Sequence, residues 1–256
     1  MRFPVYLRFG SLQIHPHWVF EAMAYAVAFR LYLALRRRQG DVLDDEARWW
    51  VIAAAAAGAA TVSKVLYWFE NPWLTIAHWR DPIFLMGGKT IVGALIGGLL
   101  AVEWTKHRLG ITRRTGDLFA LPLCVGIAVG RIGCFLTGLE DHTAGIHTAL
   151  PWGVDFGDGP RHPTQLYEIL FVILLGLGIL WYARRPHSEG DLFKCFMVGY
   201  FAFRLALDFL KPDLRAFAGL SSIQWACVCM LGYYAVPLSR RLDETSAQSS
   251  QMSART

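Results

Sequence analysis

The sequence predicts an all-α, polytopic integral membrane protein with about seven transmembrane helices, its N-terminus outward and its C-terminus in the cytoplasm. Three observations carry this prediction. The 256-residue chain is 54% hydrophobic and only 18% charged, with a mean hydropathy of +0.34, which is more apolar than a soluble core of this length requires. Apolar windows of roughly 18–22 residues, enough to cross about 30 Å of hydrocarbon, recur along the chain. Runs of arginine fall in alternate predicted loops.

The apolar windows place the spans at residues 18–35, 49–69, 84–104, 117–137, 165–183, 192–210 and 222–238. Arginine runs follow the first, third, fifth and seventh spans, at 36–38, 113–114, 184–185 and 240–241. Because short basic loops resist translocation, we place these loops in the cytoplasm. The net charge of +5 is then mainly a topology signal, and no basic stripe predicts a nucleic-acid partner.

The domain organisation is expected to be simple. Residues 1–17 lack the apolar stretch and cleavage site of a signal peptide, so the first span should remain in the protein. Residues 1–242 are predicted to form one transmembrane domain, and the polar, serine-rich segment 243–256 a disordered cytoplasmic tail. Small-residue stretches at 53–60 and 93–100 predict a close helix contact. The cysteines show neither paired metal-ligand spacing nor a disulfide pattern, so they are interpreted as buried thiols.

Ionisable residues remain inside the predicted spans, although each costs at least about 2.5 kcal/mol at the centre of a membrane helix. Arg204 and Asp208, four residues apart on one helix face, form either a simple ion pair or part of a site. Arg131 has no partner in its own span, so its counter-charge must come from another helix or from a ligand such as a phosphate. Together with Glu168 and Lys89, these residues predict an outer-leaflet cavity that suits an anionic phospholipid headgroup.

Four stretches of the chain resemble the prolipoprotein diacylglyceryl transferase family: HPHWVFEAMAY (15–25), GRIGCFLTGLED (130–141), LPWGVDFGDGPRHPTQLYEI (150–169) and GYFAFRLALDFLKPD (199–213). The resemblance implies a seven-helix enzyme of the bacterial inner membrane, with the 1–242 domain as the catalytic one. Its reaction would transfer a diacylglyceryl group from phosphatidylglycerol to the cysteine thiol of a lipoprotein precursor's signal peptide, with glycerol phosphate leaving.

The resemblance also implies roles for individual residues. The expected catalytic residues are Arg131, Arg204, Glu140, Asp208 and Lys89. The expected substrate-binding residues are Arg131, Arg204, His162, Gln165, Glu168 and Tyr25. The two arginines would hold the lipid phosphate and stabilise the charge that develops on it as the carbon–oxygen bond breaks. Phosphatidylglycerol and the precursor's signal peptide are the expected partners, the protein is expected to be a monomer, and no cofactor is expected.

The sequence departs from the family pattern at three places. Val92 stands where the family has a histidine in the third span, and Lys89, on nearly the same helix face, is the expected substitute cation or base. Cys134 replaces the asparagine after Gly-Arg-x-Gly, and either Glu140 or Asp141 fills the place of the displaced acid. Two alternatives therefore stay open: a transferase on the same scaffold that uses another lipid or acceptor, and a non-catalytic lipid-binding membrane protein.

A zinc site is a rival hypothesis for the outward loop. His142, His147 and His162 share this loop with Glu140, Asp141 and Asp158, and His15 and His17 lie on the same side of the membrane. None of them has the spacing of a helical H-E-x-x-H motif or of paired cysteine ligands. We therefore expect ordinary loop histidines and no metal.

Overall fold

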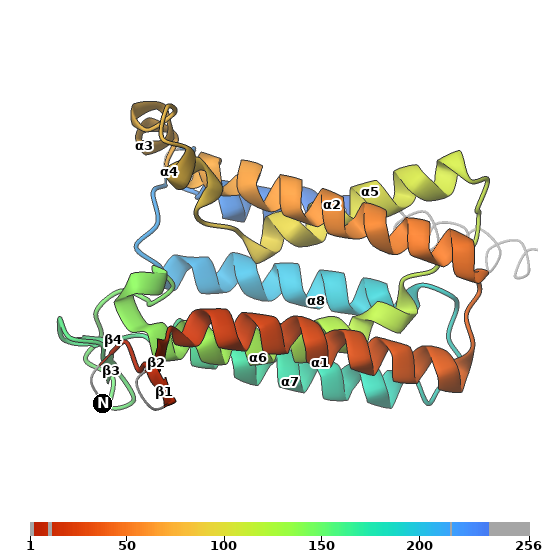
Figure 1. The fold of residues 1–256 in the computed structure, drawn as a ribbon, viewed down its shortest axis with the longest axis horizontal. Helices are drawn as coiled ribbons and strands as arrows, with labels where there is room; N and C mark the ends of the chain where they lie inside the picture. Colours follow the sequence, from red (N-terminus) through yellow and green to blue (C-terminus); the bar gives the residue numbers. More distant parts are fainter. Residues whose placement is uncertain (1–2, 10–11, 216, 236–256) are drawn as a thin grey trace, which may run out of the picture.

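Helices make up most of the computed structural model, which describes residues 3–9, 12–215 and 217–235 (Figure 1). The long helices are α1 (Pro16–Gln39), α2 (Asp45–Glu70), α5 (Ile91–Arg108), α6 (Asp117–Thr137), α7 (Thr164–Tyr182) and α8 (Asp191–Leu207). The shorter ones are α3 (Pro72–Ala77), α4 (Pro82–Met86) and the 3-10 helices η1 (Gly138–Asp141) and η2 (Asp208–Leu210). Residues 222–235 are also helical. The predicted tail at 243–256 lies outside the described residues.

Two small antiparallel hairpins complete the described fold. β1 (Leu7–Phe9) pairs with β2 (Leu12–Ile14), and β3 (Val154–Asp155) pairs with β4 (Pro160–Arg161). Both hairpins, together with α3 and α4, lie at the end of the bundle where α6 and α8 finish and α1 and α7 begin (Figure 1). We call this end of the molecule the hairpin end.

The long helices form two groups with α8 between them (Figure 1). α1, α6 and α7 pack side by side in one group, and α2 packs on α5 in the other. α8 contacts both α6 and α7, and its buried face also meets residues of α5. The inner face of α8 is apolar, as packing against other helices requires, and it carries the buried residues Phe196, Met197 and Phe201. The opposite face of α8 is exposed at Val198 and Ala202.

Local signals in the sequence set where several helices begin. Asp44 accepts a hydrogen bond from the Ala47 amide (2.8 Å) at the start of α2, and Thr90 accepts one from the Gly93 amide (3.0 Å) at the start of α5. Such N-caps satisfy amide groups that have no partner within the helix. Proline opens α1, α3 and α4, where its missing N–H costs nothing.

The predicted third span at 84–104 is wrong as a single helix. α4 ends at Met86, residues 87–90 are not helical, and α5 begins at Ile91. Gly88 has a φ of +57°, in the region that glycine adopts at least cost. Lys64 donates hydrogen bonds to the carbonyl groups of Met86, Gly87 (2.9 Å) and Gly88 (2.6 Å). The charge of Lys64 is therefore used to satisfy backbone groups at this break.

Four of the described helices are long and apolar enough to cross a bilayer, in the ranges 16–39, 45–70, 117–141 and 164–182. The protein is thus a mostly helical membrane protein. α5 has Glu103, Lys106 and Arg108 in its last turns, and α8 is 17 residues long. Because of its charges α5, and because of its length α8, are not among the helices that are long and apolar enough to cross a bilayer.

Small residues allow α2 and α5 to approach closely, as the stretches at 53–60 and 93–100 predict. A Cβ added at Gly58 would overlap the carbonyl group of Gly97, and one added at Gly97 would overlap Gly58 and the Val62 side chain. Backbone contact of this kind provides dispersion energy in lipid, where burial from water supplies little driving force.

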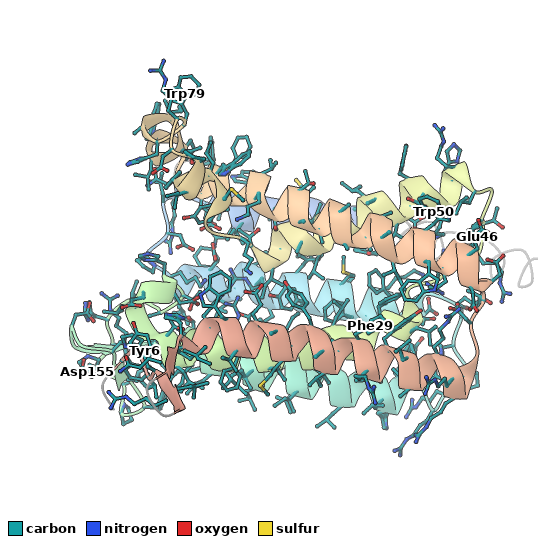
Figure 2. All side chains as sticks on the ribbon, in the orientation of Figure 1. Tyr6, Phe29, Glu46, Trp50, Trp79 and Asp155 are labelled. Atoms are coloured by element: carbon teal, nitrogen blue, oxygen red, sulfur yellow. The ribbon has the colours of Figure 1, made fainter. Side chains whose placement is uncertain are left out.

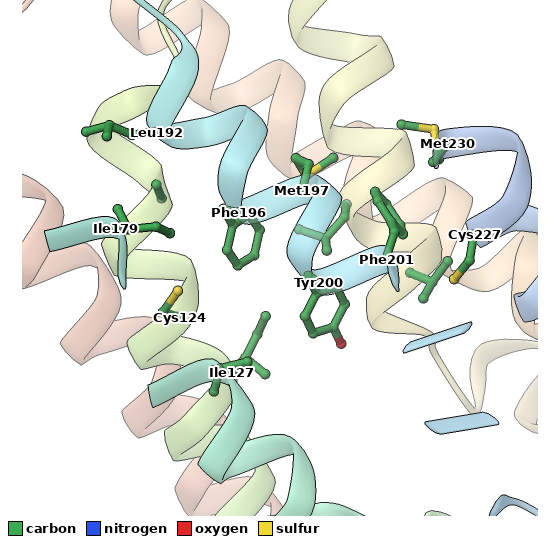
Figure 3. Packing of buried hydrophobic residues seen from close by; sticks show 14 of the residues in the cluster. Cys124, Ile127, Ile179, Leu192, Phe196, Met197, Tyr200, Phe201, Cys227 and Met230 are labelled. Carbon is green, nitrogen blue, oxygen red and sulfur yellow. The ribbon is translucent and has the colours of Figure 1, made fainter. Parts of the chain in front are cut away.

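Aromatic residues of α8 dominate the hydrophobic core. Figure 3 shows Phe196, Tyr200 and Phe201 between Cys124 of α6 and Cys227 of the 222–235 helix. Cys124, Cys134 and Cys227 are buried as expected, but Cys195 and Cys229 are exposed, so the interpretation of all five cysteines as buried is wrong. All five are free thiols.

Exposed tryptophans gather near the two ends of the bundle. Figure 2 shows Trp50 beside Glu46 at the end opposite the hairpins, and Trp79 at the hairpin end with Tyr6 and Asp155. Trp50 and Trp79 are each about 60% exposed. Tryptophan concentrates where hydrocarbon meets headgroups, so the ends of the helices correspond to the two membrane interfaces.

Candidate active site

Two buried arginines converge on one carboxylate at the hairpin end. The Nε atom of Arg131, on α6, lies 2.9 Å from Oε2 of Glu168, on α7, and Nη1 of Arg204, on α8, lies 3.7 Å from the same oxygen. All three side chains are less than 10% exposed. The expected partner of Arg131 from another helix is therefore Glu168.

Tyr200 and Asp208 hold this group of charges in place. The Tyr200 hydroxyl donates a hydrogen bond to Oε1 of Glu168 (2.6 Å), so both carboxylate oxygens of Glu168 are engaged. Nη2 of Arg204 lies 3.3 Å from Oδ1 of Asp208, which confirms the predicted contact across one helix turn. The Ser221 hydroxyl donates to the other carboxylate oxygen of Asp208.

Several donors and acceptors at this site have no hydrogen-bond partner of good geometry among the described residues. These buried atoms are Nε and Nη1 of Arg204, Nε of Arg131 and Oε1 of Gln165. A buried polar atom without a partner costs roughly 1–3 kcal/mol. Because Nε of Arg131 already faces Glu168 at 2.9 Å, the N–H groups available for an additional anion are those of Arg204, and a phosphate oxygen is a geometric match for them.

Burial shifts the pKa values of two residues just after η2. Burial, followed by the charges of Arg204 and Arg131, lowers the pKa of Lys211. Burial raises the pKa of Asp213. Both shifts are those expected of ionisable groups taken out of water, and the charges of Arg204 and Arg131 add to the lowering at Lys211.

Contacts of Gln165, in the first turn of α7, and of His162, in the loop before it, hold this loop near the site. Nε2 of Gln165 donates to the Thr143 hydroxyl (3.0 Å), and Thr164 donates to the Thr143 carbonyl group. Nδ1 of His162 lies 3.2 Å from the Tyr167 hydroxyl. Gln165 is buried and His162 half-buried. Of these, Gln165 lies one helix turn from Glu168 and belongs to the arginine site.

Of the two candidate acids in TGLED, Asp141 faces inward and Glu140 faces outward. The Asp141 side chain is 10% exposed and its Oδ1 lies 2.8 Å from Nδ1 of His17. The Glu140 side chain is 57% exposed, with His15 3.5 Å away. Cys134 lies between these groups and the arginines, because its Sγ accepts from Nη1 of Arg131 at 3.7 Å. The geometry therefore favours Asp141 over Glu140 as the acid at the site.

Lys89 does not share a helix face with Val92. It lies in the extended segment before α5, with its side chain 44% exposed and paired with Glu21 of α1. Val92 is buried at 1% exposure. Tyr25, also expected at the site, is 67% exposed and donates to Glu21 (3.1 Å). Lys89 and Tyr25 thus form a second polar group around Glu21, which reaches the Asp141 region through His17, 3.5 Å from Glu21.

Residue spacing alone could have indicated two groups that the sequence analysis missed. Tyr200 precedes Arg204 by four residues and so lies on the same helix face. His17 precedes Glu21 by four residues in the same way. Among the described residues, His17, Cys134 and Asp141 also form one group of potential metal ligands whose donor atoms all lie within 4.8 Å of one another. The loop residues His142, His147 and His162 form no such group in the described part of the chain.

The sequence profile of the prolipoprotein diacylglyceryl transferase family matches residues 4–238 of the chain. The chain belongs to this family. It is 33% identical over 252 residues to the phosphatidylglycerol–prolipoprotein diacylglyceryl transferase of Bordetella parapertussis, covering 89% of this chain and 91% of the relative. Similar relatives with the same name come from Paracidovorax citrulli, 30% identical over 255 residues, and Aromatoleum aromaticum, 31% over 253; each comparison covers 89% of this chain and 91% of the relative.

Proposed function

We propose that this protein transfers the diacylglyceryl group of phosphatidylglycerol to the cysteine thiol in the signal peptide of a lipoprotein precursor. The convergence of Arg131 and Arg204 on one buried carboxylate carries the proposal. Membership of the transferase family, with relatives named for this reaction, supports it. In this proposal neither a nucleic acid nor a cofactor takes part, and the protein works as a monomer with a single 1–242 catalytic domain.

The proposed topology has seven spans in the bacterial inner membrane, with the N-terminus outward. In this arrangement the hairpin end faces the outer leaflet, and the arginine runs at 36–38, 113–114 and 184–185 face the cytoplasm. α5, α8 and the helix that begins at residue 222 cross with the four longer helices, because α8 packs on α6 and α7 and shares one apolar core with α5 and the helix that begins at residue 222. The charged ends of α5 then reach the cytoplasmic headgroups.

In the proposed reaction, Arg131 and Arg204 bind the lipid phosphate. Nε and Nη1 of Arg204, which have no hydrogen-bond partner in the described structure, donate to phosphate oxygens. The acceptor thiolate attacks the glycerol carbon, a sulfur–carbon bond forms, and the carbon–oxygen bond to phosphate breaks with its electron pair on oxygen. Two fixed guanidinium groups stabilise the charge gained by the leaving glycerol phosphate, in a site with little water to compete.

Supporting roles follow from contacts to the arginines. Glu168 balances their charges and Asp208 orients Arg204, so both act as positioning residues rather than as groups that touch the substrate. Gln165 has a buried, unpartnered Oε1 atom that can accept from a glycerol hydroxyl. His162 holds the loop before α7 through Tyr167. Glu140 and Tyr25, both exposed, contact the peptide or headgroup at the rim of the site.

An apolar groove beside the site suits an acyl chain. It is lined by Leu66 and Phe69 of α2, by Phe217, and by Ser222 and Trp225 at the start of the next helix. Ser221, the neighbour of Ser222, donates to Asp208. A lipid with its phosphate on the arginines would therefore have an apolar surface within the same region for one of its chains.

A transfer assay with arginine variants tests the proposal. Purified protein in detergent is incubated with phosphatidylglycerol and a cysteine-containing signal peptide, and the peptide is examined for a diacylglyceryl mass increase. Arg131→Lys and Arg204→Lys keep the positive charges beside Glu168 but replace a guanidinium, which can donate two parallel hydrogen bonds to phosphate, by a single ammonium group. Each should lower kcat by at least about 100-fold. His142→Ala, at an exposed loop position, should retain the parent rate. Full turnover in both lysine variants would defeat the phosphate assignment.

The same assay tests a second candidate function, which is considered because Val92 stands where the family has a histidine. A transferase that uses another nucleophile on this scaffold would give no product with the signal peptide, yet would still bind phosphatidylglycerol, whereas one that uses another lipid would give product only when that lipid is supplied. Lys89→Met tests whether Lys89 is the base that replaces the missing imidazole. Since Lys89 pairs with Glu21 and lies outside α5, we expect its removal to lower turnover only a few-fold. A loss as large as that of Arg131→Lys would identify Lys89 as the base.

A further inference from the structure

Three metal-binding side chains from separate parts of the chain meet beside the arginine site. His17 comes from the first turn of α1, Cys134 from the last turn of α6, and Asp141 from the end of η1. One donor atom from each lies within 4.8 Å of the other two. Cys134 is 8% exposed and the Asp141 side chain 10%. The group combines an imidazole nitrogen, a sulfur and a carboxylate oxygen, which are the ligand types that Zn²⁺ takes in proteins.

The contacts within the group already bring its donor atoms together. Nδ1 of His17 and Oδ1 of Asp141 form an ion pair at 2.8 Å, and the other carboxylate oxygen of Asp141 accepts a hydrogen bond from the Thr143 hydroxyl at 2.8 Å. Oε2 of Glu21 lies 3.5 Å from the other ring nitrogen of His17. A ligand histidine commonly places its second nitrogen against a carboxylate, and Glu21 occupies that place.

The charges around the group permit a divalent cation. Arg131 lies 3.7 Å from the sulfur of Cys134, but Glu168 compensates its charge at 2.9 Å. Lys89 is compensated in the same way by Glu21. The negative charges of Asp141 and of a Cys134 thiolate therefore remain for the ion.

We propose that His17, Cys134 and Asp141 bind a thiophilic divalent cation of the Zn²⁺ type, and that its fourth position takes the sulfur of the acceptor thiol. This second part rests on the proposed function. Three protein ligands and one open position are typical of catalytic zinc, and a thiol that coordinates such an ion is deprotonated.

The ion would supply what the missing imidazole at Val92 cannot. The acceptor S–H bond gives up its proton to water as sulfur coordinates the ion. The thiolate then forms the sulfur–carbon bond while the carbon–oxygen bond breaks, and the released glycerol phosphate leaves with the electron pair of that bond. No electron is gained or lost overall. Because Sγ of Cys134 lies 3.7 Å from Nη1 of Arg131, a sulfur bound to the ion would lie close to the phosphate held by Arg131.

A Co²⁺ titration tests the site without reference to activity. Co²⁺ is added to the full-length protein in detergent, and the sulfur-to-cobalt charge-transfer band is followed in the near ultraviolet. We expect one equivalent to bind. Cys134→Asn, which restores the residue typical of the family, should abolish the band and weaken binding by more than about 10-fold, with the helical circular dichroism unchanged. Cys124→Ser, at another buried cysteine of α6, should keep the band. No band in the parent protein, or a band that survives Cys134→Asn, would overturn the site.

A transfer assay on protein freed of metal by a chelator separates this proposal from the proposed function. Loss of transfer on chelation, with recovery on adding Zn²⁺, supports both. Full transfer by protein that contains no metal overturns the role of the ion and leaves the proposed function in place. Co²⁺ binding without transfer under any condition supports the metal site and overturns the transferase reaction.

Discussion

Replacing Glu168 by glutamine tests how far the arginine site depends on its central carboxylate. The amide keeps the volume of the side chain and an oxygen that can accept from Tyr200 at 2.6 Å. It removes the negative charge that Arg131 and Arg204 share, at 2.9 and 3.7 Å. Breaking a buried ion pair by removing one partner costs about 3–5 kcal/mol. Since Asp208 still pairs with Arg204, we expect a loss at the lower end, about 3 kcal/mol of unfolding free energy.

The assay is unfolding of the detergent-solubilised protein by titrated denaturing detergent, with and without phosphatidylglycerol. If the lipid phosphate binds the arginines, it replaces the missing negative charge, so added lipid should stabilise Glu168→Gln more than the parent protein. Glu168→Asp, which keeps the charge, serves as the control and should lose less. A Glu168→Gln protein within about 0.5 kcal/mol of the parent, far below the cost of an uncompensated buried charge, would refute the reasoning.

The remaining predictions concern packing, pH and the break before α5. Gly97→Ala should cost about 1–3 kcal/mol of unfolding free energy because its Cβ would overlap α2, whereas Gly98→Ala, whose Cβ would lie 3.6 Å or more from its neighbours, should be nearly neutral. Burial raises the pKa of Asp41, but hydrogen bonds from Arg48, the Leu43 amide and Arg36 together lower it below its ordinary value of 3.8. The resulting stability is present above that value and is lost as the pH falls through the folded-state pKa, so Asp41→Asn should flatten the unfolding midpoint measured across this acid range. Lys64→Met should speed amide hydrogen exchange at residues 86–90, measured by mass spectrometry, because three carbonyl groups lose their donor; unchanged exchange would contradict the role of Lys64.

Helix positions were largely predictable because the apolar windows and the arginine runs between them can be located in the sequence directly. The predicted span at 117–137 coincides with α6. The expected helix at 84–104 failed because an average of hydropathy cannot detect the turn at Gly88, nor the contribution of Lys64 from another helix. The number of spans and their orientation stay predictions.

The arginine site was predictable in outline and not in detail. A lone arginine in an apolar span requires a partner, and that requirement pointed from Arg131 to another helix. The choice between Glu140 and Asp141 depends on the 3-10 turn of η1 and on the left-handed conformation of His142, with φ of 52°, which no pattern indicated. His17 meets Asp141 only through the packing of α1 on α6.

The two helix groups are joined in different ways, and this has a consequence for how a two-tailed lipid reaches the arginines. α2 and α5 interlock backbone to backbone at Gly58 and Gly97, so they should move as one body. Their contacts with α8 run through side chains, which can slide past one another in small steps. The Lys89–Glu21 pair spans the boundary between the two groups at the hairpin end. We therefore expect the two helix groups to separate sideways at this boundary when an anionic headgroup competes with Glu21 for Lys89.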